Sequence, residues 1–271
     1  MTEPQKKAGV PPPQQQYGMQ QAPTQFGMQP GQQQQWMPMP QNIPGCPPGL
    51  EYLTQIDQLL VHQQVELFEA FTNIETKNRY AIKNSVGQQC YFAYEESDLC
   101  MRICCGQARG FMLHIVDNAG QEVIRINRPF KCCSGCCWCA NTDHCSWNLD
   151  IESPVGTPIG QVRQSQSFWK PHYDIKDASG QTVFKIKGPC CICHGICCTC
   201  DFPFEIHPKS LDQPPIGRIA KQWSGFAKEM FTDATNFSVS FPMDLDVKMK
   251  AVLLGATFLI DMMFFENQNQ Q

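Results

Sequence analysis

Two cysteine-dense runs give this chain its most reactive side chains. The first run spans Cys132 to Cys139, with His144 close behind it, and the second spans Cys190 to Cys200 and contains His194. Thiolates together with imidazole nitrogens match the ligand set of tetrahedral zinc. On a connecting loop the same thiols can instead carry fatty acyl chains in thioester linkage, and each buried methylene then adds about 0.8 kcal/mol of membrane affinity.

The spacing in the first run favours acylation over zinc. A structural zinc site usually has two separated cysteine pairs, whereas this run is crowded around Trp138 and offers Cys133 with Cys136 as one zinc-like pair. Thiols with no role are a third interpretation, and for the second run we favour it. Zinc therefore stays an alternative cofactor that is less favoured than acylation.

Composition limits the compartment and the partners. The first 45 residues contain no apolar stretch that would indicate a secretory signal, so we expect the domain to stay in the cytosol. In that reducing compartment the 17 cysteines are expected to be free, metal-bound or acylated rather than disulfide-paired. The net charge of −4 gives no general attraction to nucleic acid or anionic lipid, and no direct nucleic-acid site is evident.

A repeated module positions both cysteine runs. The segments Met112 to Pro129 and His172 to Pro189 align without a gap, and each contains a glycine turn, at Asp117–Gln121 or Asp177–Gln181, between apolar runs. Such turns between apolar runs are typical of β-hairpins. Because strand-like segments also follow each cysteine run, the middle of the chain is predicted to be a duplicated all-β unit with a thiol cluster at a matching connection in each copy.

Strand-length segments continue outside the repeat, at Val65–Phe71, Asn78–Asn84, Cys90–Tyr94 and Leu99–Ile103. The total is near a dozen short strands, which is too many for one open sheet and predicts a closed barrel. We expect three parts: a disordered head rich in Pro and Gln at 1–48, a barrel domain at 49–266, and a polar tail at 267–271.

The C-terminal segment is predicted to be a helix. Asp246 is a candidate N-cap, and residues 247–265 are apolar on nearly every face. The stretch from Ala251 to Phe265 reaches only about 22 Å, short of the hydrocarbon core of about 30 Å. Asp261 would add about 2.5 to 3.5 kcal/mol in the bilayer centre. A helix buried inside the barrel is therefore favoured over one that spans the membrane.

Several segments together resemble the phospholipid scramblase family, over roughly residues 47–266. The resemblance implies a tubby-like fold, in which twelve antiparallel strands close around a central hydrophobic C-terminal helix. It also implies a membrane-associated protein linked to calcium-triggered, ATP-independent, bidirectional movement of phospholipids between leaflets. The matching segments are Pro47–Leu53, Asp117–Ile124, the first cysteine run, Gly217–Gly225, Asp244–Val252, Phe258–Asp261 and Phe264–Glu266.

The resemblance also assigns palmitoylation to the first cysteine run, which would anchor the protein at the cytoplasmic face of the plasma membrane, with the C-terminal helix as a further membrane contact. This run departs from the denser run of the family at Gly135 and Ala140, so it does not settle which thiols are modified. The candidate residues are Cys132, Cys133, Cys136, Cys137 and Cys139.

A calcium site is also implied by the resemblance, at Asp233 to Asp244, with Asp233, Thr235 and Asp244 as candidate ligands. The segment has the length of an EF-hand loop but not its chemistry, because Phe237 occupies the fifth position and the last ligand is not a bidentate Glu. Its alternation of apolar and polar residues predicts a half-buried strand. We therefore expect any calcium affinity to be low, about millimolar.

Two segments suggest protein partners. Arg218, Lys221 and Trp223 lie in a segment that resembles a nonclassical nuclear import signal, which implies importin and a nuclear pool. With only two basic residues, an amphipathic strand is the simpler interpretation. Pro44 to Pro47 is a Pro-x-x-Pro motif of the kind that SH3 or WW modules bind.

No hydrolytic or redox constellation is present, because the chain lacks Gly-x-Ser-x-Gly, His-Glu-x-x-His and a phosphate-binding glycine loop. We therefore do not expect an enzyme of covalent chemistry, which is consistent with lipid translocation. Three hypotheses stay open: a palmitoylated scramblase acting on membrane phospholipids, a palmitoyl-anchored signalling adaptor or lipid-binding protein with no intrinsic lipid flux, and a metal–thiolate protein.

Overall fold

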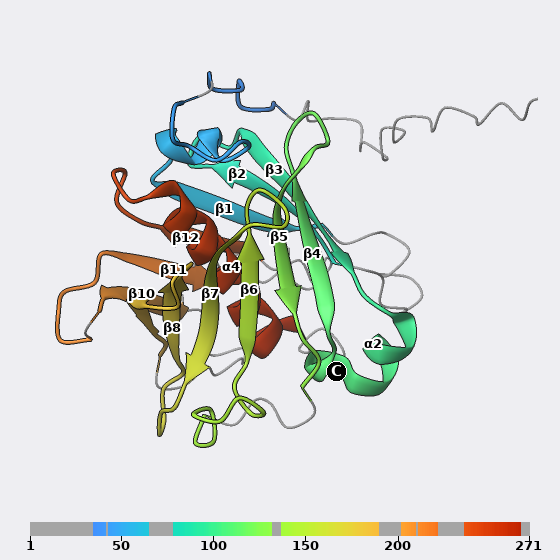
Figure 1. Ribbon diagram of the computed structural model, residues 1–271, viewed down its shortest axis with the longest axis vertical. Coiled ribbons are helices and arrows are strands. Elements are labelled where there is room, and N and C mark those ends of the chain that lie inside the picture. The colour runs from blue at the N-terminus through green and yellow to red at the C-terminus, as the bar shows by residue number, and fades with distance from the viewer. Residues whose placement is uncertain are drawn as a thin grey trace, which may run out of the picture. The chain divides into compact units, whose positions relative to one another are not determined.

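The computed structural model describes residues 35–41, 43–64, 78–131, 137–189, 202–209, 211–221 and 236–266. Within these residues, twelve antiparallel strands form a closed barrel, and each strand pairs with its neighbours in sequence until β12 pairs with β1 (Figure 1). The predicted barrel is confirmed. The strands are β1 (Gln58–Gln63), β2 (Arg79–Asn84), β3 (Gln89–Glu96), β4 (Phe111–Val116), β5 (Glu122–Arg128), β6 (Asn148–Glu152), β7 (Pro158–Ser165), β8 (His172–Asp177), β9 (Thr182–Lys187), β10 (Phe202–Pro208), β11 (Gly217–Lys221) and β12 (Asn236–Ser240).

Two hairpins confirm the predicted duplication. In the turn between β4 and β5, Asp117 Oδ1 accepts hydrogen bonds from the backbone N–H groups two and four residues later, both at 2.9 Å. Asp177 makes the same two contacts between β8 and β9, at 2.9 and 3.0 Å. Gly120 and Gly180 follow with φ of +76° and +80°, a conformation that favours glycine. The same local chemistry therefore closes both copies of the hairpin.

The predicted strand at Leu99–Ile103 is wrong, because these residues belong to the helix α2 (Leu99–Cys105). Asp98 caps this helix by accepting a hydrogen bond from the backbone N–H of Met101 at 3.0 Å, and Gly106 ends it with φ of +49°. A five-residue run with four apolar residues fits a strand or a helix equally well. The Asp and Gly that flank the run at helical spacing are the signal that the sequence analysis missed. Two short 3₁₀ turns complete the described elements, η1 (Glu51–Gln55) and η2 (Gly106–Ala108).

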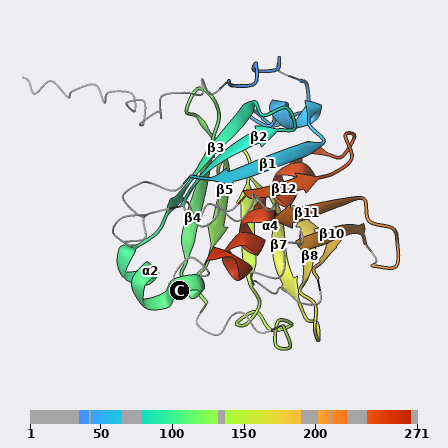
Figure 2. The ribbon, with the colours of Figure 1, turned by 180° about the vertical axis from the view of Figure 1, so that it is seen from behind.

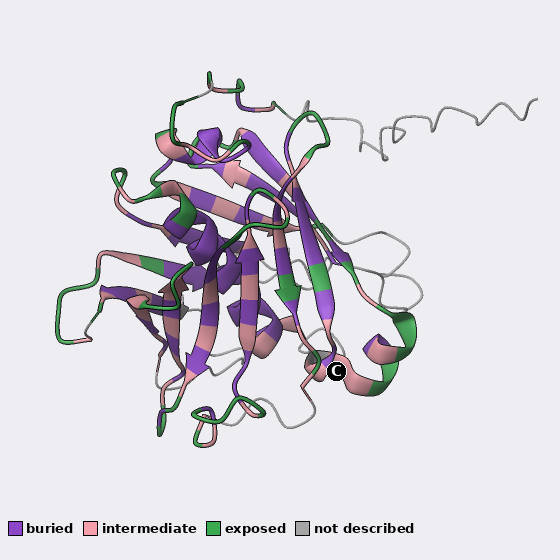
Figure 3. Cartoon of the chain, viewed as in Figure 1, coloured by how far each residue is buried: buried purple, intermediate pink, exposed green. Residues whose placement is uncertain are grey.

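The helix α4 (Val247–Phe264) lies inside the barrel (Figure 2). Asp246 caps it as predicted, with Oδ1 accepting from the backbone N–H groups of Lys248 at 2.8 Å and Met249 at 3.3 Å. Every residue from Met249 to Met262 is buried (Figure 3). The prediction of a buried helix is confirmed, because the strands cover a helix that is apolar on all its faces. None of the described helices combines the length and hydropathy needed to cross a bilayer.

Glycines allow α4 to approach the sheet closely. A Cβ atom added to Gly160 on β7 would lie 2.4 Å from the carbonyl oxygen of Lys176 and 2.7 Å from Cγ2 of Val252 on α4. A Cβ added to Gly255 on α4 would lie 3.1 Å from Cγ1 of Ile151 on β6. The absence of a side chain at Gly160 therefore allows α4 to pack directly on β7.

Lys250 is a buried cation near the start of α4. Its Nζ donates three hydrogen bonds to backbone carbonyl oxygens, those of Leu53 at 2.9 Å, Ile56 at 2.8 Å and Met243 at 2.7 Å. Burial lowers the pKa of Lys250 from its usual value. The three carbonyls use all three ammonium donors, so this contact ties the helix to η1 and to the connection that precedes α4.

The segment before the barrel also packs against it. Trp36 forms a parallel bridge with Gln89 of β3, and Met37 is buried as part of the hydrophobic core. Further along, the backbone N–H of Cys46 donates to the carbonyl oxygen of Ile43 at 3.0 Å, and Gly45 has a φ of +86°. The Pro-x-x-Pro motif at 44–47 is therefore a turn in this structure and lacks the polyproline II geometry that SH3 and WW modules bind.

Candidate functional site at the cysteine-rich end of the barrel

The strand order gathers nearly all the cysteines at one end of the barrel. Consecutive strands are antiparallel, so the connections that follow β3, β5, β7 and β9 all lie at the same end. The first of them contains α2, and the connections after β5 and β9 contain the two cysteine runs. All cysteines except Cys46 and Cys90 belong to these connections. We call this end, in the lower part of Figure 1, the cysteine-rich end.

The structure describes part of the first cysteine run. Cys137 and Cys139 are half-buried, while Cys132, Cys133 and Cys136 lie outside the described residues, as does the whole second run. Gln164 at the end of β7 directs its Nε2 toward Cys137 Sγ at 3.6 Å. Cys137 therefore contacts the end of β7. The predicted roles of these five thiols stay predictions.

Three further thiols on α2 were missed by the sequence analysis. Cys100 and Cys104 are exposed, one helical turn apart, with their Sγ atoms 4.0 Å from each other, and Cys105 is half-buried. A hydrogen bond and electrostatic interaction with Cys104 raise the pKa of the Cys100 thiol. Exposed Leu99 and Ile103 accompany them on the helix. These thiols were overlooked because Leu99–Ile103 was interpreted as a strand, in which Cys100 counts as one more apolar residue, and Cys104 and Cys105 follow that segment.

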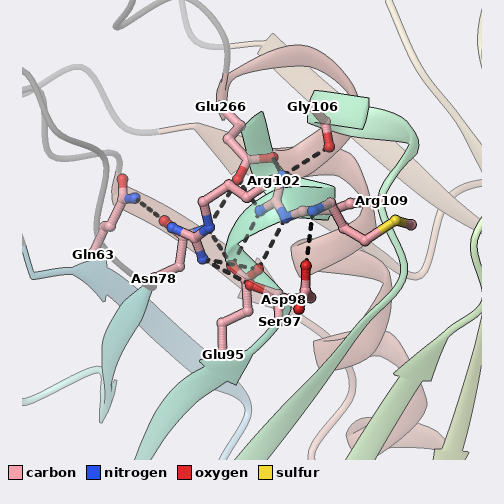
Figure 4. A network of polar contacts seen from close by, with 10 residues as sticks. Gln63, Asn78, Glu95, Ser97, Asp98, Arg102, Gly106, Arg109 and Glu266 are labelled. Atoms are coloured by element: carbon pink, nitrogen blue, oxygen red, sulfur yellow. Dashed lines mark hydrogen bonds and ion pairs between the residues drawn. The ribbon is translucent and has the colours of Figure 1, made fainter. Parts of the chain in front are cut away.

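A buried polar network closes the cysteine-rich end around the last turn of α4 (Figure 4). Arg109 donates from Nε and Nη2 to both oxygens of Glu95, at 2.9 and 3.1 Å, and also pairs with Glu266 just beyond α4. Asn78 donates to Glu95 at 2.7 Å and to Glu266 at 2.9 Å. Arg102 of α2 reaches Glu95 at 3.1 Å. The network therefore joins β3, α2, the residues just before β2 and β4, and the end of α4.

The electrostatics of this network favour its charged form. Burial alone would raise the pKa of Glu95, but the guanidinium groups of Arg109 and Arg102 more than offset this and lower it. Burial would likewise lower the pKa of Arg109, and Glu266 and Glu95 raise it instead. Two buried carboxylates and two buried guanidinium groups thus compensate one another. The charged groups of this network bond to one another, so we interpret the network as a structural element that stabilises the fold and not as a substrate-binding site.

The predicted calcium segment is a strand where it is described. Asn236 to Ser240 form β12, as the alternation predicted, and Asp244 follows at the opposite end from the cysteine-rich end. Asp233 and Thr235 lie outside the described residues. A strand rises about 3.3 Å per residue, so β12 separates its two ends by about 13 Å.

The residues of the import-signal segment are placed on β11. Arg218 is exposed and Lys221 is half-buried, with its Nζ 4.8 Å from the ring centroid of Phe265, while Trp223 lies outside the described residues. β11 pairs with β10 on one side and β12 on the other. Its backbone is therefore engaged in the sheet on both edges.

Within the described parts of the chain, no three His, Cys, Asp or Glu side chains are placed to hold a metal ion.

Comparisons with known proteins identify a family that this chain resembles over most of its length. The family model described as Scramblase matches residues 37–267. The chain is 53% identical to phospholipid scramblase 1 of Homo sapiens, over 87% of this chain and 71% of the relative. It is 51% identical to phospholipid scramblase 2 of Bos taurus, over 85% of this chain and 76% of the relative. Phospholipid scramblase family member 5 of Homo sapiens is 46% identical, over 82% and 78%. The comparison with solved structures gave no match.

Proposed function

The chain belongs to the phospholipid scramblase family, and on that premise we propose that it moves membrane phospholipids between leaflets in both directions, triggered by calcium and without ATP. The observation that carries the proposal is similarity across the whole barrel, α4 included, rather than over a short motif. Members of this family translocate lipids and change no covalent bond, which supports the expectation that the protein is not an enzyme of covalent chemistry.

Anchoring is proposed through palmitoyl chains on Cys132, Cys133, Cys136, Cys137 and Cys139, at the cytoplasmic face of the plasma membrane. The position of this run on a connection at one end of the barrel supports it, because acyl chains there can enter a bilayer without disturbing the core. One chain gives marginal attachment and two or more give stable attachment. The five-residue Cys→Ser variant should therefore lose stable attachment and shift toward the soluble fraction of expressing cells, whereas Cys100→Ser with Cys104→Ser should stay in the membrane fraction.

The calcium trigger is proposed to act through ligands at the two ends of β12, Asp233 with Thr235 at one end and Asp244 at the other. Since each end would supply few formal charges, the affinity should be low, about millimolar. Asp244→Asn is then expected to raise the calcium concentration needed for lipid movement. Asp212→Asn, which removes an exposed aspartate from the connection between β10 and β11, is the charge-matched control.

The deciding experiment is reconstitution of the purified chain in liposomes that carry a fluorescent phospholipid in both leaflets. A membrane-impermeant reductant bleaches the outer leaflet, so scrambling increases the fraction of probe that is lost. Calcium should increase that fraction in the absence of ATP, and protein-free liposomes should keep it unchanged. If the chain binds to the liposomes but the bleached fraction equals that of protein-free liposomes, intrinsic scrambling is ruled out.

A second candidate function is that of a palmitoyl-anchored signalling adaptor or lipid-binding protein without intrinsic lipid flux. The burial of α4 favours it, because a helix enclosed by twelve strands cannot at the same time line a path through the bilayer. Its partners would be importin at Arg218, Lys221 and Trp223 and SH3 or WW proteins at the Pro-rich head, the latter only if the turn at 44–47 opens into polyproline II geometry. Membrane attachment with partner binding and no flux in the liposome experiment would decide for this function.

A further inference from the structure

Three exposed aromatic rings form a cluster at the cysteine-rich end. Trp138, from the connection between β5 and β6, packs edge to face against Phe168 and Trp169 from the connection between β7 and β8, with ring centroids 6.2 and 6.3 Å apart. Their exposed fractions are 58%, 73% and 79%, so the rings contribute little to the core. We call these three residues the aromatic cluster.

Hydrogen bonds hold the aromatic cluster in place. The indole Nε1 of Trp138 donates to the carbonyl oxygen of Phe168 at 2.8 Å, and Gln166 Nε2 donates to the carbonyl oxygen of Trp138 at 2.9 Å. The backbone N–H of Ser167 donates to the carbonyl oxygen of Cys137 at 3.1 Å. Two connections that are distant in sequence are thus joined beneath the rings. An apolar surface that is held in order and left exposed marks a site of interaction.

Lysines border the aromatic cluster. Lys170 directly follows it in sequence, Lys187 pairs with His172 across β8 and β9, and Lys185 is two residues further along β9. The pKa of His172 is lowered mainly by burial and further by the positive charges of the three lysines. All three ammonium groups are therefore close enough to His172 to act on its charge.

Carboxylates on the same face do not cancel these charges. Asp174 lies opposite Lys185 in the register of β8 and β9, and Glu205 lies opposite Lys187 in the register of β9 and β10. Asp143, on the same connection as Trp138, is paired with Arg163 at 2.7 Å, so that pair adds no net charge, and the three lysines against the two acids leave one positive charge. The border of the aromatic cluster is therefore basic although the whole chain carries a net charge of −4.

We propose that the aromatic cluster together with Lys170, Lys185 and Lys187 is a docking surface for an anionic phospholipid bilayer, and that it works without acyl chains. Tryptophan rings lie preferentially at the membrane–water interface, and lysines close to the surface attract anionic headgroups. Cys137 precedes the cluster directly, so acyl chains on the first cysteine run would enter the same bilayer. The inference rests on the proposed function in taking a membrane as the place where the protein works.

Other features of the barrel agree with this orientation. At the cysteine-rich end, Leu99 and Ile103 of α2 are exposed and would add apolar contacts to the docked face. Charge alone does not distinguish the two ends, because exposed acids lie at both. These are Glu96, Asp98 and Asp143 at the cysteine-rich end, and Asp57, Asp212, Asp244 and Asp246, with Lys209 and Lys248, at the opposite end. Among the described residues, large exposed aromatic rings gather at the cysteine-rich end and not at the opposite end. The rings therefore set which end meets the bilayer.

The test is cosedimentation of the full chain, prepared without acylation, with vesicles of phosphatidylcholine and phosphatidylserine. Wild type is expected to bind. A variant with Phe168→Ser and Trp169→Ser should lower the partition coefficient about a hundredfold, roughly tenfold for each ring that no longer enters the interface. A variant with Lys170→Gln, Lys185→Gln and Lys187→Gln should bind the anionic vesicles less, and the binding that is left should no longer depend on the salt concentration.

The matched control removes exposed apolar side chains from the opposite end, through Val86→Ser with Met243→Ser. This control should bind as wild type does. The inference is overturned if unacylated wild type fails to bind, or if the control loses as much binding as the variant of Phe168 and Trp169. The apolar positions are exposed and the three lysines are half-buried, so the unfolding midpoint of each variant is measured, and an unchanged midpoint excludes misfolding as the cause.

A second readout separates docking from lipid movement. Bromine atoms on the acyl chains should quench tryptophan fluorescence in docked protein, and Trp169→Phe should lose part of that quenching while still binding. Wild type that docks and is quenched but shows no flux in the liposome experiment would sink the scramblase proposal alone. Flux in acylated protein, with no docking and no quenching of unacylated protein, would sink the docking surface alone.

Discussion

The hydroxyl of Tyr80 donates a hydrogen bond to Oδ2 of Asp261 at 2.9 Å, inside the barrel. Both residues are almost completely buried, and burial together with Asp261 raises the pKa of Tyr80 well above its usual value. Asp261 is the residue that made a bilayer location costly for the C-terminal helix, and β2 supplies the partner that lipid would lack. With Lys250 near its other end, α4 has a polar contact to the barrel close to each terminus.

Tyr80→Phe should therefore destabilise the protein by about 1 to 3 kcal/mol, since Asp261 loses a buried donor while the ring that packs on Phe258 is kept. Urea unfolding followed by circular dichroism measures the change. The control is Tyr94→Phe, which removes the hydroxyl of a partly exposed tyrosine on β3 and should change stability by less than about 0.5 kcal/mol. Equal losses in the two variants would contradict a special role for the buried pair.

Glu95→Gln should lower stability at neutral pH by about 3 kcal/mol, because it removes the charge that compensates Arg109 and Arg102. The folded-state pKa of Glu95 lies below its ordinary value of 4.5, so its contribution is present above that value and is lost as the pH falls through the folded-state pKa. The unfolding free energies of wild type and variant should thus converge in acid.

The control for the buried carboxylate is Glu205→Gln. Glu205 is half exposed and meets His207 at 3.3 Å on the outside of the barrel. A surface pair of this kind contributes about 0 to 1 kcal/mol, so the change should be small at every pH. A gap between wild type and Glu95→Gln that stayed constant down to pH values well below 4.5 would show that charge on Glu95 does not support the fold.

The parts of this fold that depend on local chemistry could be predicted from the sequence. The Asp117 and Asp177 turns, the alternation on their flanking strands and the cap at Asp246 each involve residues within a few positions of one another. The apolar faces of α4 also required an enclosing structure, whichever strands supplied it. These signals were sufficient to predict the barrel, its duplication and its buried helix.

Features that depend on partners far apart in the chain could not be predicted. Arg109 and Glu266 are 157 positions apart, and Trp138 meets Phe168 across 30 positions, so neither contact leaves a local pattern. The helix α2 is a different case, because its Asp98 and Gly106 caps are local signals that were missed, whereas the burial of Arg102 against Glu95 could not be predicted from the sequence. The order of the strands predicts that the cysteines gather at one end, but which of them are exposed depends on these long-range contacts.

Gly160→Ala is expected to destabilise the barrel by about 1 to 3 kcal/mol, since the added methyl would meet a backbone oxygen at 2.4 Å that cannot move aside. Gly255→Ala is the matched comparison at the same helix–sheet interface. Its methyl would meet only the flexible end of Ile151, at 3.1 Å, and alanine gains about 1 kcal/mol of helix propensity over glycine. Thermal unfolding should rank Gly255→Ala clearly above Gly160→Ala, and the reverse order would show that the approach of α4 to β7 is looser than this packing.

A disulfide between α4 and the sheet should leave lipid movement unchanged. The fourteen consecutive buried residues of α4, at about 1.5 to 3 kcal/mol for each large apolar side chain, would cost more to expose than the 5 to 15 kcal/mol that holds a typical domain folded. We therefore expect the helix to stay inside the barrel while the protein works.

Positions 151 and 255 are close enough to be joined, because a Cβ at 255 would lie 3.1 Å from Ile151 Cγ1. Ile151→Cys with Gly255→Cys should keep wild-type flux in liposomes with or without reductant, with wild type and Gly255→Cys under the same oxidation as controls. If flux stopped when the bond formed and returned on reduction, α4 would have to leave the barrel for lipids to move.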